Sequence, residues 1–206
     1  MSYSQFTLAS VKKTFDLTTF EEADIFAGVP KRGRSDYLAE TLRYNVPLAL
    51  ASNSEKARSE MIIAPILIEV RKQLQSRLSL FSGVEFNVDT ETGLTGYCYF
   101  ILSHSSEQLI ITAPVMMLVE GKNENLKGGL GQCIAEMVAA QLFNEREDNK
   151  IPAIYGAVTT GTNWKFLKLT GKTVEIDLNE YYLTEIEQIL GILVTGIQES
   201  KKVITA

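Results

Sequence analysis

The chain has 206 residues, of which 45% are hydrophobic and 22% are charged, so it has the composition of a folded globular protein and the length of one domain. Its net charge of −5 gives no overall attraction to nucleic-acid phosphates, although it is compatible with a local basic cleft. The single histidine, His104, excludes a zinc site built on several histidines and disfavours a His-dependent triad.

Targeting and membrane signals are not found in the sequence. Residues 1–10 lack a basic start followed by an apolar run, and the longest central apolar run, Ala113–Val119, is too short to cross a bilayer. We therefore expect a soluble, cytoplasmic protein with no membrane partner. Cys98 and Cys133 have no metal-ligand spacing, and we expect them to be reduced, buried thiols.

Residues 1–50 give mixed signals and predict an extension of helices and loops that packs on the core. Leu8–Phe15 and Phe20–Phe26 are predicted as short helices. The basic segment 29–34 is predicted as a solvated loop, with phosphate contact as the alternative.

The first strong element is a helix predicted over Ser54–Phe81, with Ser54 as its N-cap. Apolar residues recur at steps of three and four from Ile63 onward, and extending this stripe back by three residues reaches Glu60. A carboxylate in line with a buried stripe requires a partner, so Glu60 is a candidate site residue; a solvated position is the alternative. Pro65 is expected to disturb the first turns.

A β-hairpin is predicted next, from Val84–Val88 and Gly96–Ser103 around a polar turn. Strict alternation along the second strand puts Tyr97, Tyr99 and Ile101 on one face and Cys98, Phe100 and Leu102 on the other. Asp89 and Glu91 belong to the turn and are expected to be solvated.

A continuously apolar run predicts a central strand over Val115–Lys122, covered on both faces, with Pro114 at its start. A second long helix is predicted over Asn125–Arg146. Its glycine-rich start either weakens the first turns or permits close packing.

Three short strands, Ile154–Thr159, Trp164–Leu169 and Val174–Leu178, and a last helix, Thr184–Glu199, complete the chain. The order of helix, three strands, helix, strands and helix predicts an α/β fold in which helices flank a mixed central sheet. We expect one domain over residues 1–206.

Glu120 and Lys122 are the strongest candidates for chemistry. They are two residues apart on a strand and therefore project from the same face. A carboxylate in this position is a suitable ligand for magnesium, and a lysine can stabilise charge on a phosphate oxygen. The alternative is a simple ion pair at the end of a strand.

These parts together resemble the PD-(D/E)XK, or restriction-endonuclease-like, nuclease superfamily, and most closely a cyanobacterial-type branch of it. The resemblance covers about residues 45–197. It rests on the motifs Glu60, Gly96–Leu102, Val119–Lys122, Gly131–Cys133, Ile154–Gly161 and Trp164–Leu167.

The resemblance implies hydrolysis of DNA phosphodiesters with magnesium or manganese. In that scheme Glu120 and the Gly121 carbonyl bind the metal, Lys122 orients or activates water, and Glu60 supports the metal from its helix. Gln132 holds the geometry or contacts the substrate; the alternative is an ordinary helix residue.

The sequence departs from the family pattern at the position of the main metal ligand. The main metal-binding Asp of the family falls at Tyr99, whose neutral phenol is a poor magnesium ligand. We interpret Tyr99 as a core aromatic, as a plug in place of the ligand, or as both; Asp89 or Glu91 as a substitute acid is a further alternative. Two hypotheses follow: an impaired metal-dependent nuclease, or a catalytically inactive nuclease-fold binding module that uses no metal. Either is compatible with a homodimer.

Overall fold

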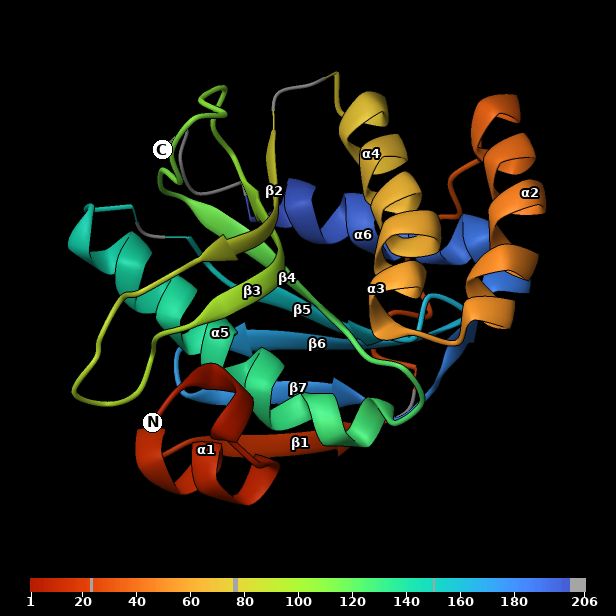
Figure 1. The fold of residues 1–206 in the computed structure, drawn as a ribbon. Coiled ribbons are helices and arrows are strands. Elements are labelled where there is room, and N and C mark those ends of the chain that lie inside the picture. The colour runs from red at the N-terminus through yellow and green to blue at the C-terminus, as the bar shows by residue number, and fades with distance from the viewer. Residues whose placement is uncertain (23, 76–77, 150, 201–206) are drawn as a thin grey trace.

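The computed structural model describes residues 1–22, 24–75, 78–149 and 151–200, and their centre is one eight-stranded mixed sheet (Figure 1). The strand order is β1-β7-β6-β5-β4-β3-β2, with β8 paired to β6. The strands are β1 (Thr18–Glu22), β2 (Ser79–Glu85), β3 (Tyr97–Ser103), β4 (Val115–Gly121), β5 (Ile154–Thr159), β6 (Asn163–Thr170), β7 (Thr173–Asp177) and β8 (Tyr181–Tyr182). The predicted mixed α/β architecture is confirmed.

The middle of the sheet is the parallel pair β4 and β5, and antiparallel strands flank it on both sides. Every residue of these two strands is buried, as the continuously apolar sequence of β4 predicts. The parallel pairing requires a crossover, and α5 (Leu126–Arg146) supplies it between the two strands. The carboxyl ends of β4 and β5 therefore meet at one end of the sheet.

Helices cover both faces of the sheet. α1 (Leu8–Phe15) packs on α5 over one face, where η1 (Tyr3–Gln5) also contacts α5. The other face carries α2 (Asp36–Ser52), α3 (Glu55–Arg58), the π-helical turn η2 (Ser59–Ile63), α4 (Ala64–Gln73), η3 (Leu183–Glu185) and α6 (Ile186–Glu199). In Figure 1, α2 and α4 lie side by side.

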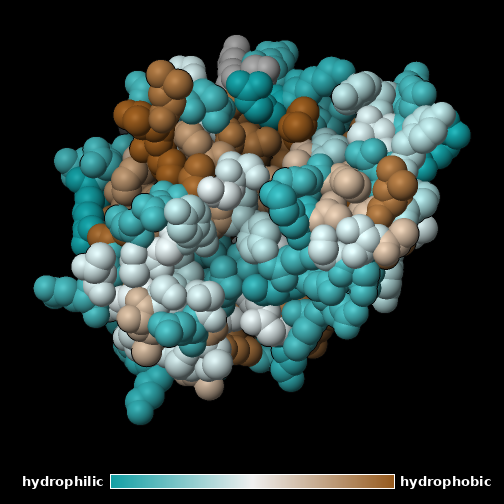
Figure 2. Space-filling model, in the orientation of Figure 1, coloured by the Kyte–Doolittle hydropathy of each residue, from teal (hydrophilic) through white to brown (hydrophobic). Residues whose placement is uncertain are grey.

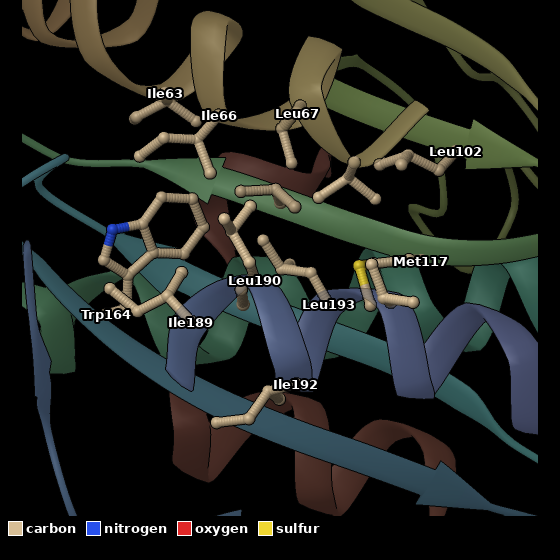
Figure 3. Packing of buried hydrophobic residues seen from close by; sticks show 14 of the residues in the cluster. Ile63, Ile66, Leu67, Leu102, Met117, Trp164, Ile189, Leu190, Ile192 and Leu193 are labelled. Carbon is tan, nitrogen blue, oxygen red and sulfur yellow. The ribbon is translucent and has the colours of Figure 1, made fainter. Parts of the chain in front are cut away.

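The core under α4 and α6 is built mainly from aliphatic and aromatic side chains. Figure 3 shows Ile66 and Leu67 of α4 and Leu190 and Leu193 of α6 pointing toward one another, with the Trp164 ring beside them. All five side chains are fully buried. Burial of one such side chain contributes about 1.5–3 kcal/mol, so these contacts fix the two helices to the sheet.

Pro65 does not break the first core helix, because the chain widens into the π-helical turn η2 immediately before it. Proline leaves the carbonyl four residues earlier without its helical donor. That carbonyl belongs to Met61, and it accepts a hydrogen bond from Asn45 Nδ2 of α2 at 2.9 Å. Ser54 is the N-cap, as predicted, but the helix ends at Gln73, so the predicted end at Phe81 is wrong.

The N-terminal segment contains a strand where a helix was predicted. The helix predicted over Phe20–Phe26 is wrong: Thr18–Glu22 forms β1, which pairs in parallel with β7 at the edge of the sheet. Residue 23 lies outside the described residues. The helix Leu8–Phe15 and the exposed basic loop at 29–34 are as predicted.

The face assignment predicted for β3 is also wrong. Cys98 and Ile101 belong to the core under α5, whereas Phe100 and Leu102 belong to the core under α4 and α6. Strict alternation is interrupted at Tyr99, which packs with the second group. The residue that it faces across the hairpin is Gly83, which has a positive φ of 63°. The irregularity moves the Tyr99 ring to the face opposite α5.

The surface carries hydrophobic residues in the loop that joins β3 to β4. Leu109 is 98% exposed and Ile110 is 61% exposed. Figure 2 shows hydrophobic surface at the corresponding upper left of the molecule. Within the described part of the chain, no helix has the length and apolar character needed to span a bilayer.

Candidate functional site

Glu120 and Lys122 leave the end of β4 on the α5 face, as their spacing predicts. The Lys122 ammonium Nζ lies 2.7 Å from Glu120 Oε1. The Glu120 side chain has no exposed surface, and that of Lys122 is 22% exposed. Lys122 packs against Gly129 of α5, where a Cβ would lie 3.0 Å from Lys122 Cε. The helix therefore holds the lysine over the carboxylate.

Gln132 joins this pair, because its Oε1 accepts a hydrogen bond from Lys122 Nζ at 3.2 Å. Its Nε2 donates to Glu136 Oε1 at 3.1 Å, one helical turn further along α5. Glu136 is fully buried. Glu120, Lys122, Gln132 and Glu136 thus form one connected polar cluster, named here the β4–α5 cluster, between the strand and the helix.

The two carboxyls of the β4–α5 cluster titrate together. Burial raises the pKa of Glu120 to about 7, although the Lys122 charge opposes this rise. Burial, followed by the negative charge of Glu120, raises the pKa of Glu136 well above its usual value. Oε2 of each carboxyl accepts no hydrogen bond from the described residues. One proton shared between the two carboxyls supplies the donor that both lack.

Lys122 stays charged in this environment. Burial alone lowers the pKa of a lysine, but the adjacent Glu120 carboxylate outweighs that effect, and the pKa of Lys122 is raised. The cluster therefore holds one cation and one shared negative charge near neutral pH.

Tyr99 and Glu55 meet on the opposite face of the same strand end. The Tyr99 hydroxyl donates a hydrogen bond to Glu55 Oε1 of α3. The Tyr99 ring lies on Gly121, where a Cβ would be 3.3 Å from Tyr99 Cδ1. Burial, followed by the hydrogen bond to Glu55, raises the pKa of the Tyr99 hydroxyl, so it remains a protonated donor. The ring therefore lies against Gly121 on one face of the strand end, whereas the Glu120 carboxylate lies on the other face with Lys122 and α5.

Glu60 is not brought to this region. Its side chain is 58% exposed and forms an ion pair with Lys56 Nζ at 2.6 Å. The π-helical turn changes the angular spacing of residues just before Ile63, so extending the stripe backwards places Glu60 incorrectly. The helix carboxylate that approaches the end of β4 is Glu55, whose negative charge acts on both Glu120 and Lys122.

The substitute acids Asp89 and Glu91 stay in the hairpin turn. Asp89 Oδ1 accepts hydrogen bonds from the backbone amides of Glu91 and Thr92. Asp89 borders a pocket together with Leu142, in the C-terminal half of α5. Glu120 faces the N-terminal half, so neither acid replaces a ligand beside it.

Magnesium does not fit this arrangement. It requires accessible carboxylate oxygens and keeps several waters. The Glu120 carboxylate is buried away from solvent and is paired with the Lys122 ammonium. On β3, the side chain that faces α5 is Cys98, and burial raises the pKa of its thiol, so it supplies no negative charge for a metal ion. Across the described residues, no three His, Cys, Asp or Glu side chains are grouped to hold a metal ion.

Protein-family models, curated proteins and solved structures gave no match to this chain.

Two residues of the site were not predicted from sequence. Glu136 lies four residues after Gln132 on the predicted helix, so helical spacing was a usable signal for it. Glu55 directly follows the predicted N-cap Ser54. The sequence pattern alone does not show that Glu55, and not Glu60, approaches the end of β4, because this depends on the π-helical turn η2.

The shared proton predicts a pH-dependent stability. The pKa of Glu120 is raised from 4.5 to about 7 in the folded protein, so folding favours the protonated carboxyl. The contribution of Glu120 to the free energy of unfolding is therefore fully present below pH 4.5 and is lost as the pH rises through 7. This loss is on the order of 3 kcal/mol. Urea denaturation is expected to give a lower free energy of unfolding at pH 8 than at pH 5.

Glu136→Gln is expected to flatten this dependence and to stabilise the protein at pH 8 by about 1–2 kcal/mol, because glutamine replaces a carboxyl that burial disfavours as an anion.

Glu145→Gln is the matched control for that experiment, because Glu145 is exposed on the same helix. It is expected to leave the pH dependence unchanged. A wild-type protein that becomes more stable between pH 5 and pH 8 would contradict the shared proton.

Proposed function

We propose that this chain is a nuclease-derived domain of the restriction-endonuclease-like type that has lost hydrolysis and acts by binding. One observation carries the proposal: the carboxylate expected to bind the metal, Glu120, is completely buried and lies 2.7 Å from the Lys122 ammonium. A carboxylate in that state offers no oxygen to a hydrated cation. The β4–α5 cluster then serves as an internal support between sheet and helix.

The order of elements supports the ancestry in this proposal. α4, the three strands β2, β3 and β4, the helix α5 and the strand β5 follow one another as the resemblance implies. An active metal-dependent nuclease is the second candidate, and the Glu55 carboxylate, which the Tyr99 hydroxyl holds near the end of β4, favours it.

A cleavage assay separates the two candidates. Wild-type protein and Glu120→Gln are incubated with plasmid and oligonucleotide DNA in magnesium or manganese, and binding to the same duplex is measured in parallel. We expect equal, background-level cleavage from both proteins. Cleavage by wild type that Glu120→Gln reduces by about a hundredfold or more would establish the nuclease instead.

Tyr99→Asp tests whether one residue accounts for the inactivity. We expect no cleavage from this variant, because position 99 faces Glu55 whereas Glu120 stays paired with Lys122 on the other face. The same assay measures it, with Tyr99→Asn as the uncharged control. Metal-dependent cleavage by Tyr99→Asp, but not by Tyr99→Asn, would show that the loss of one carboxylate had inactivated an otherwise intact site.

A further inference from the structure

A polar pocket of about 420 Å³ opens beside the carboxyl ends of β4 and β5. It lies between the segment that connects β4 to α5 and the turn that connects β5 to β6. The residues that line it with hydrogen-bonding or positively charged side chains include Arg58, Asn123, Asn125, Lys127, Thr160 and Thr162. The pocket is adjacent to the β4–α5 cluster but shares no residue with it.

Arg58 is the buried cation of this pocket, with only 9% of its surface exposed. Its Nε donates to Asn123 Oδ1 at 3.1 Å, and its Nη1 donates to the Thr160 carbonyl at 3.1 Å. Its Nη2 donates to Asn53 Oδ1 at 3.4 Å. These three acceptors are neutral, and no carboxylate of the described chain lies within 4.0 Å of the guanidinium.

A buried guanidinium without an anion is unfavourable, because neutral acceptors do not replace the hydration of a full charge. The fixed hydrogen bonds nevertheless hold it in one orientation at the pocket wall. Glu124 and Glu180 also line the pocket, but both are exposed and therefore well solvated. Their charges are screened by water, whereas the charge of Arg58 is not.

Other groups at the pocket also favour a negatively charged ligand. Lys127 is exposed in the first turn of α5, a helix of 21 residues whose dipole directs partial positive charge toward this end. The hydroxyls of Thr160 and Thr162 lie 3.1 Å apart on the other wall. A guanidinium, an ammonium and hydroxyl donors together suit an oxyanion with several acceptor atoms.

We propose that this pocket binds a phosphate group, with Arg58 as its buried anchor and Lys127 at its entrance. A phosphate supplies the full negative charge that the guanidinium lacks and an acceptor for the one threonine hydroxyl proton that the hydrogen bond between Thr160 and Thr162 does not use. The proposal does not depend on whether the domain cleaves DNA, because Glu120 and Lys122 are not among the residues used.

Isothermal titration of the full chain with inorganic phosphate at constant ionic strength tests this site. Wild type is expected to bind one phosphate. Lys127→Glu is expected to weaken binding about tenfold or more through charge reversal at an exposed position, and Arg58→Met is expected to abolish it. Lys172→Glu is the matched control, since Lys172 lies in the turn after the opposite end of β6, and it is expected to bind as wild type does.

The outcomes are decisive even if Arg58→Met fails to fold, because Lys127→Glu changes only an exposed side chain. Absence of phosphate binding to wild type, or equal weakening by Lys127→Glu and Lys172→Glu, overturns the proposal. A second titration compares an oligonucleotide bearing a 5′-phosphate with its 5′-hydroxyl form. Binding of the 5′-phosphorylated form that is tighter than that of both its 5′-hydroxyl form and inorganic phosphate identifies a nucleic-acid end as the source, and phosphorylated and hydroxyl forms that bind equally identify free phosphate.

Discussion

Lys122→Met is expected to destabilise the protein by about 3–5 kcal/mol at pH 8, because it leaves the Glu120 carboxylate buried without its cation. Gln132 loses the ammonium donor to its Oε1 at the same time. The loss in free energy of unfolding is expected to be smaller at pH 5, where Glu120 is protonated. Urea denaturation at the two pH values measures both effects.

The double variant Lys122→Met/Glu120→Gln is the control for this prediction. It removes both charges, so it is expected to recover most of the stability lost in Lys122→Met. A single variant as unstable as the double variant would show that Lys122 contributes by its packing on Gly129 and not by its charge.

Gly131→Ala is the second substitution with a large expected effect. A Cβ at this position would lie 2.4 Å from the Phe6 carbonyl oxygen and 2.4 Å from the Thr7 carbonyl carbon. Both are backbone atoms, so no side-chain rotation relieves the contact. We expect a loss of about 3 kcal/mol, at the upper end for overpacked sites. Hydrogen exchange is expected to show faster exchange across η1 and α1, because that segment must move away from α5.

Gly128→Ala is the matched substitution on the same helix. Its Cβ would approach the Asn125 side chain at 3.2 Å, and this neighbour can adjust. Alanine also favours the helix over glycine by about 1 kcal/mol. We therefore expect Gly128→Ala to be neutral or stabilising, and a Gly131→Ala protein of equal stability would refute the close packing of α1 on α5.

Much of the fold was predictable because hydrophobic spacing is periodic in the elements concerned. The continuously apolar β4 and the helix α5 were predicted within one residue of their observed ends. β1 was mistaken for a helix, since a five-residue strand at a sheet edge gains its stability from pairing with β7. α2 was not predicted: Pro47 lies inside it, although Leu38, Leu42, Val46 and Ala49 recur at steps of four and three and pack on the core.

The candidate site was predictable only where it obeys regular geometry. The spacing of Glu120 and Lys122 on a strand placed both side chains correctly. Tyr99 and Glu60 were misplaced, since an interrupted alternation in β3 and a π-helical turn before α4 each rotate side chains away from their ideal positions. Such local irregularities depend on tertiary contacts, for example the hydrogen bond from Asn45 to the Met61 carbonyl.

The pairing of β1 with β7 also has a consequence for synthesis of the chain on the ribosome. Thr18 lies opposite Thr173, so β1 cannot pair with its neighbour until β7 has emerged from the ribosome. Contacts so distant in sequence form late. During that interval the nascent amino-terminal segment is exposed to chaperones and proteases, and a shortened product that ends before β7 leaves it permanently without a place in the sheet.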